Sequence, residues 1–195
     1  MTDTLSGSVT NAAGQPFLEG NLFPMHEELT ENECRVTGQV PAALNGTFVR
    51  NGPNPMFEPT GRDHMFDGVG MLVGFRFDEG RVGFKNRWIH SKALDAEIRL
   101  GRAVYPGLAD MMNFPSEELV GDAGPVKNPA NTHIVRHAGK MLALWEGGLP
   151  TQVTADLDTV GEWDFGGRLD GPMTAHPRID PRTGEMFFFG YQPFP

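Results

Sequence analysis

Three turns centred on glycine constrain the fold of this chain more than any other feature. They hold Gly80, Gly139 and Gly184, and they recur at intervals of 59 and 45 residues. Apolar and polar side chains alternate beside them, which is typical of strands with one buried face, and such turns join antiparallel neighbours. The expected hairpin strands are residues 71–77 and 81–89, 131–137 and 140–145, and the strand after Gly184 is 186–189. The spacing is loosely that of four-stranded propeller blades, so the sequence predicts an all-β fold with few helices.

The rest of the chain gives a second set of expectations. Residues 92–102 have the pattern of a short helix, and the acidic run 27–33 predicts a single helical turn. The cluster Asn51-Gly-Pro-Asn-Pro55 is rich in turn formers and predicts a loop. Residues 1–20 are polar and glycine-rich, and we expect an extended arm there. Further strands are expected at 35–40, 47–50, 151–157 and 162–165, with irregular structure at 104–124.

Composition excludes several classes of protein. The 195 residues suit one domain, and 16 prolines with 14 phenylalanines argue against a helical bundle. A formal charge of −9 argues against a nucleic-acid partner, because phosphates are bound by clustered lysine and arginine. The single cysteine, Cys34, allows no internal disulfide and is expected to be a small buried side chain. The sequence shows no apolar signal core and no run long enough to span a bilayer, so we expect a cytoplasmic protein.

One histidine has a distinctive setting. His176 is followed by Pro177, and proline pushes the residue before it into extended geometry. The turn 180–185 and the apolar run 186–189, which we expect to be a buried strand, come next. This arrangement would hold an imidazole on rigid extended backbone. Spacing alone, however, favours an ordinary polar side chain that makes its own hydrogen bonds.

A second pair of histidines has the spacing of a metal site on a helix. His133 and His137 lie in a segment that reads as strand, turn and strand. Four residues along a strand separate side chains by about 13 Å, which is too far for one metal ion. We therefore expect both to be surface or turn residues.

Several motifs, in order along the chain, resemble those of the carotenoid cleavage oxygenase family. The clearest are Gly46-Thr-Phe-Val-Arg-Asn-Gly-Pro-Asn-Pro55, His64-Met-Phe-Asp-Gly-Val-Gly-Met71 and Thr174-Ala-His-Pro-Arg-Ile-Asp-Pro-Arg-Thr-Gly-Glu185. Val69 stands where the family usually has aspartate. Shorter matches occur at 85–88, 131–132 and 144–148. The resemblance implies a seven-bladed β-propeller, of which residues 21–195 would form the first blades.

The resemblance also implies a chemistry. In the family, four histidines hold one Fe(II), which leaves coordination open for dioxygen. His176 aligns with the first ligand. Glu146 aligns with a glutamate that hydrogen-bonds to a ligand and fixes its tautomer, and its partner there is one of the later histidines. The implied reaction adds O₂ across a conjugated C=C bond of a carotenoid or apocarotenoid and releases aldehyde or ketone products.

The remaining ligands are expected beyond Pro195, so we expect no oxygenase activity from these 195 residues alone. A non-catalytic remnant or a binding β-domain is the alternative from another functional class.

Further site expectations concern the substrate. Stilbene-cleaving relatives place a lysine before the glutamate, where this chain has Trp145, so a polyene is favoured over the alternative aryl-alkene. Trp145 would otherwise be an ordinary core residue. By the resemblance, residues 104–120 would contact a membrane peripherally, although packing beneath a loop would also explain their apolar side chains. The side chains expected along a substrate tunnel are Trp145, Phe57, Met111, Met112 and Phe114.

Overall fold

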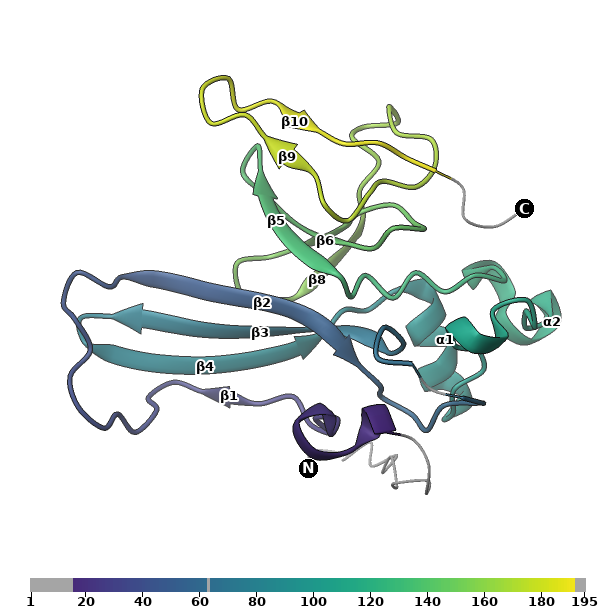
Figure 1. Ribbon diagram of the computed structural model, residues 1–195, viewed down its shortest axis with the longest axis horizontal. Helices are drawn as coiled ribbons and strands as arrows, with labels where there is room; N and C mark the ends of the chain where they lie inside the picture. The colour runs from purple at the N-terminus through teal and green to yellow at the C-terminus, as the bar shows by residue number, and fades with distance from the viewer. Residues whose placement is uncertain (1–15, 63, 192–195) are drawn as a thin grey trace.

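Two antiparallel sheets of four strands each, with a two-stranded ribbon beside the second, make up this computed structural model (Figure 1). It describes residues 16–62 and 64–191. The first sheet has the order β1-β4-β3-β2, with bounds Thr30–Glu31, Arg81–Trp88, Val69–Asp78 and Gly46–Asn54. The second has the order β5-β6-β7-β8, with bounds His133–His137, Lys140–Leu144, Thr151–Val153 and Thr159–Glu162. The ribbon pairs β9 (Arg178–Ile179) with β10 (Met186–Phe187).

The helices are short and lie beside one end of the first sheet (Figure 1). The α-helices are α1 (Lys92–Leu100) and α2 (Glu117–Val120), and the 3₁₀ turns are η1 (Pro16–Leu18), η2 (Gly20–Leu22), η3 (Leu108–Asp110) and η4 (Gly121–Ala123). Ser91 caps α1 by accepting from the Leu94 N–H, and Gly101 ends it in the left-handed region. In the described part of the chain, no helix has both the length and the apolar character needed to cross a bilayer.

The two predicted hairpins with alternating strands are confirmed. Glu79 and Gly80 have φ of 49° and 84°, and Ala138 and Gly139 have φ of 47° and 78°. Paired positive φ values in a two-residue loop match the twist of antiparallel strands. The register follows directly, with Asp78 opposite Arg81 and His137 opposite Lys140. The predicted all-β class with few helices is therefore correct.

The predicted loop at residues 51–55 is wrong for most of its length. β2 continues through Asn54, and Pro53 lies opposite Gly70 of β3. Proline is tolerated there because β2 is an edge strand, where a missing N–H removes no ladder bond. The predicted strand at 47–50 is thus the first half of a longer one.

Near the N-terminus, the expectations for 27–33 and 35–40 are wrong. Residues 27–33 contain the two-residue strand β1 instead of a helical turn, and no strand forms at 35–40. Val36 is 40% exposed, so the alternation there has no buried face to pack. Cys34 is only partly buried. Of the expected N-terminal arm, residues 1–15 lie outside the described part, while Leu18 in η1 is buried.

The later strand predictions are only partly correct. The strand expected at 151–157 stops at Val153, because Leu157 turns with φ of 68° and packs into the core. The strand expected at 162–165 instead spans Thr159–Glu162. The run 186–189 is not a buried strand: only its first two residues pair, and Phe187 and Phe189 are 60% and 65% exposed. The ribbon has two strands only, and Phe189 lies beyond the end of β10.

The core joins the two sheets. One buried cluster combines Leu72 of β3 with Ala143 of β6, together with Ile89, Ala130, Val153 and Leu157. Gly70 makes this approach close, since a Cβ there would lie 2.6 Å from the Ala130 carbonyl oxygen. The Gly70 N–H donates to the Pro129 carbonyl at 2.7 Å, which fixes the segment that leads into β5.

Candidate functional site

His176 lies on a well-anchored segment two residues before β9. The preceding Thr174 and Ala175 are buried, and the Thr174 N–H donates to the Phe189 carbonyl at 2.8 Å. The His176 N–H donates to Thr174 Oγ1 at 3.3 Å. The imidazole itself is 69% exposed, so the backbone holds it in place while the ring remains accessible.

Glu146 is the carboxylate beside this ring. Its Oε1 lies 3.4 Å from His176 Nε2. The expectation that a later histidine is the partner of Glu146 stays a prediction, because those histidines are expected beyond Pro195. The hairpin β5–β6 ends at Leu144, and Glu146, two residues later, reaches the segment that carries His176. A carboxylate beside one ring nitrogen favours a single tautomer, as in many metal-binding histidines.

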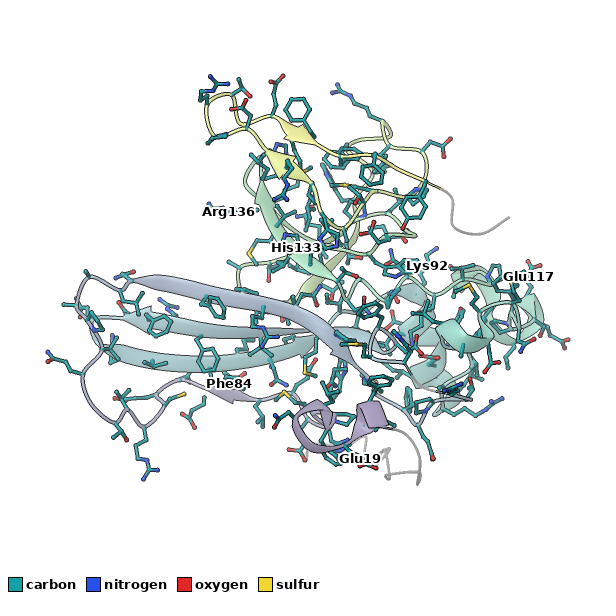
Figure 2. All side chains as sticks on the ribbon, viewed as in Figure 1. Glu19, Phe84, Lys92, Glu117, His133 and Arg136 are labelled. Atoms are coloured by element: carbon teal, nitrogen blue, oxygen red, sulfur yellow. The ribbon has the colours of Figure 1, made fainter. Side chains whose placement is uncertain are left out.

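His133 is a third member of this cluster. Its ring stacks on His176, with centroids 6.2 Å apart and planes at 30°. Figure 2 labels His133 on β5, between the first sheet and the β9–β10 ribbon. Burial and then the neighbouring His176 lower the pKa of His133, which favours its neutral form. The strand spacing correctly predicted that His133 and His137 lie apart, and His137 Nε2 contacts the Gly184 carbonyl at 3.0 Å. The same spacing did not predict the contact of His133 with His176.

A cavity of about 700 Å³ opens beside this cluster. Both His176 and Glu146 line it, and so do four of the five residues expected along a tunnel, namely Trp145, Phe57, Met111 and Phe114. Met112 does not line it and is 63% exposed instead. The structure therefore brings His176, Glu146 and most of the expected apolar residues into one space.

The motif around Asp67 builds one wall of the cavity. Asp67 accepts from the His64 N–H at 2.9 Å and from the Leu108 N–H at 3.0 Å, through different carboxylate oxygens. Asn131 Nδ2 donates to the carbonyls of Phe66 and Gly68. These bonds tie together three loops that are far apart in sequence, which explains why a motif without iron ligands lies at the site.

A buried ion pair also lines the cavity, and the sequence reading missed it. Glu97 of α1 is 1% exposed, and Lys127 Nζ lies 2.6 Å from its Oε2. The helical spacing of the sequence could have indicated that Glu97 is buried, because it shares a helix face with the buried Ala93 and Leu94. Tyr105 lies beside the pair, and burial, followed by the charge of Glu97, raises its pKa to about 12.

The donor set fits part of an iron site. His176 offers an accessible imidazole on the cavity wall, and Glu146 stands beside it. Within residues 16–62 and 64–191, no three side chains of His, Cys, Asp or Glu converge as a metal site would require. One imidazole with a neighbouring carboxylate suits a ligand and its orienting group, and further ligands would be needed to hold the ion.

Comparison with known proteins identifies the family of this chain. The family model for retinal pigment epithelial membrane protein matches residues 22–195. Carotenoid 9,10(9′,10′)-cleavage dioxygenase 1 of Phaseolus vulgaris is 36% identical over 190 residues, which cover 90% of this chain and 35% of that relative. The chain thus spans about a third of the length of the curated relatives it matches.

Solved structures show the same relationship. Lignostilbene dioxygenase of Pseudomonas brassicacearum superposes with a TM-score of 0.83 at 34% identity, covering 91% of this chain and 37% of that one. Cobalt-substituted apocarotenoid oxygenase of Synechocystis gives 0.67 at 34% identity, covering 81% and 34%. These relatives are β-propellers, and the two sheets match part of that fold. The chain belongs to the carotenoid cleavage oxygenase family.

Proposed function

We propose that this chain supplies part of the active site of an iron-dependent dioxygenase that cleaves a conjugated C=C bond of an apolar alkene. The observation that supports it is the convergence of the His176–Glu146 pair and aromatic side chains on one cavity. An apolar cavity with a few polar groups at its wall is typical of a site for an apolar ligand. The names of the relatives point to the same chemistry, on carotenoids and on stilbenes.

Each residue has a stated role in this proposal. His176 is one iron ligand, and Glu146 orients its ring. Iron, when bound, supplies the activation of O₂ beside the alkene. The stacked ring of His133 limits how far His176 can rotate. Phe57, Met111 and Phe114 hold the alkene by apolar contact and keep water from it.

We expect a polyene such as an apocarotenoid to be preferred over a stilbene. Trp145 lines the cavity directly before Glu146, where stilbene-cleaving relatives place a lysine. An indole has one N–H donor and no charge, so it cannot polarise a phenol as an ammonium does.

The test is a chimera in which this chain replaces the matching part of the Pseudomonas brassicacearum lignostilbene dioxygenase. The relative supplies the rest of the site. Purified with iron and assayed under oxygen, the chimera should release carbonyl fragments from an apocarotenal, and faster than from resveratrol. Faster turnover of resveratrol would overturn the substrate preference. A folded, iron-loaded chimera that cleaves neither compound would overturn the proposed function.

The 195-residue chain by itself should behave differently. Because His176 is the one imidazole among the described residues that line the cavity, we expect the chain to release Fe(II) on anaerobic dialysis and to leave the apocarotenal intact. Iron analysis after dialysis checks this. Retention of one iron per chain, with O₂-dependent cleavage, would contradict it.

We also propose that residues 104–120 contact a membrane peripherally. Met112 is 63% exposed, and Leu108, Phe114 and Leu119 are 38%, 38% and 36% exposed. Asp110 and Glu117 oppose anionic lipid, so vesicles of neutral phosphatidylcholine are the appropriate probe. Met112→Asp should reduce co-sedimentation, whereas Phe48→Asp, at an exposed position on β2, should not. Equal co-sedimentation of all three proteins would remove the idea. A cytoplasmic location stays a prediction.

A further inference from the structure

The Glu97–Lys127 ion pair has no place in the iron site, yet both residues line the cavity. Glu97 comes from α1 and Lys127 from the segment before β5, whereas His176 and Glu146 come from the second sheet and the chain after it. The lining therefore takes these two polar groups from different elements. It also includes apolar side chains, with Phe57, Met111 and Phe114 among them.

The two side chains of this pair use their hydrogen-bonding groups to different extents. Glu97 Oε1 accepts from the N–H groups of Val104 and Tyr105 at 3.0 and 3.2 Å, and Oε2 accepts from Lys127 at 2.6 Å. The carboxylate is thus well satisfied. An ammonium group has three N–H donors, and among the described residues Glu97 is the acceptor assigned to that of Lys127. Lys127 retains donors for a ligand in the cavity.

We propose that Lys127 donates a hydrogen bond to a neutral oxygen, a hydroxyl or a carbonyl, at one end of the substrate. This inference rests on the proposed function and narrows its substrate class to an apolar alkene with a neutral oxygen at its terminus. Glu97 makes the site favour a substrate with a neutral terminal group over one with a charged terminal group. Its negative charge balances Lys127, so a substrate carboxylate would gain a cation and meet a buried anion at the same time.

The 195-residue chain can test this through three ligands that share one polyene. Retinol ends in a hydroxyl, axerophthene in a methyl group and retinoate in a carboxylate. Each absorbs near the emission of tryptophan, and Trp145 lines the cavity, so quenching of protein fluorescence reports binding. We expect retinol to bind more tightly than retinoate.

Lys127→Met is the first variant. It should weaken the binding of retinol by about tenfold or more, because a hydrogen bond from a charged group is lost. The affinity for axerophthene should stay unchanged, because the apolar wall of the cavity is kept. Lys92→Met is the matched control. Lys92, labelled in Figure 2, is an exposed lysine at the start of α1 that pairs with Asp122 at 3.1 Å. It is not among the residues that line the cavity. It should bind all three ligands as the parent chain does.

Glu97→Gln is the second variant, and it separates recognition from general loss of structure. A glutamine keeps an acceptor for the Val104 and Tyr105 N–H groups but removes the negative charge. Retinoate should then bind more tightly than it does to the parent chain. The double variant Glu97→Gln with Lys127→Met should lose both the preference for retinol and this gain.

The outcomes distinguish the two proposals. Equal weakening of retinol and axerophthene by Lys127→Met, or no gain for retinoate in Glu97→Gln, would overturn the role of Lys127 and leave the proposed function standing. Absence of binding for all three ligands to the parent chain would also overturn the role of Lys127, and cleavage by the chimera would still decide the proposed function.

Discussion

His176→Ala will lower apocarotenal cleavage by the chimera by more than about 100-fold. Loss of a group that merely orients a metal ligand typically costs about 10–100-fold, so loss of the ligand itself should cost more. Glu146→Gln provides the comparison, because its oxygen lies 3.4 Å from His176 Nε2 and its expected loss falls within that smaller range. The measurement is kcat/KM for the apocarotenal with each protein loaded with iron.

His90→Ala is the matched control for this series. His90 is an exposed histidine that pairs with Asp95 at 2.8 Å and does not line the cavity. Its replacement should leave the rate unchanged. A His176→Ala chimera that retained turnover close to that of the control would show that His176 is not an iron ligand.

Glu97→Ala will cause the largest loss of stability that we expect from a single substitution in this chain. It removes a buried carboxylate, leaves the Lys127 ammonium without its partner, and frees the N–H groups of Val104 and Tyr105. Breaking a buried ion pair by removing one partner costs about 3–5 kcal/mol. For a protein of this size, each kcal/mol shifts the melting temperature by roughly 2–4 °C.

Thermal unfolding followed by circular dichroism measures this effect on the 195-residue chain. Asp122→Ala is the matched control, because Asp122 pairs with Lys92 entirely at the surface. A hydrogen bond to Lys92 and the lysine's charge lower the pKa of Asp122, but solvent screens the pair, so the melting temperature should hardly change. If both variants melted alike, Glu97 and Lys127 would not form the buried pair described above.

The sequence was most informative where local chemistry decides the structure. The hairpin turns need positive φ at Gly80 and Gly139, and glycine is the residue that adopts it most readily. Where tertiary position decides, it was misleading. Pro53 suggests a loop, but it belongs to an edge strand that can do without its N–H. Phe187 and Phe189 suggest a buried strand, yet the ribbon that carries Phe187 has only two strands.

The site shows the same division. The motifs predicted His176 and Glu146 as site residues, because both lie in sequence motifs that resemble those of the family. Their contact with each other and the stack on His133 could not be read from spacing, since they depend on how the second sheet meets the segment before β9. Met112 and Phe114 are two residues apart and equally apolar, but only Phe114 lines the cavity. The conformation of this loop, rather than its composition, determines which of the two side chains lines the cavity.

The metal content of the chimera tests the central claim most directly. Purified after growth with iron and analysed by mass spectrometry, the chimera should carry about one iron per chain, and the His90→Ala control the same. The His176→Ala chimera should carry far less, while its circular dichroism spectrum remains that of the parent. A correctly folded His176→Ala chimera with the parent's full iron content would contradict the assignment of His176 as an iron ligand.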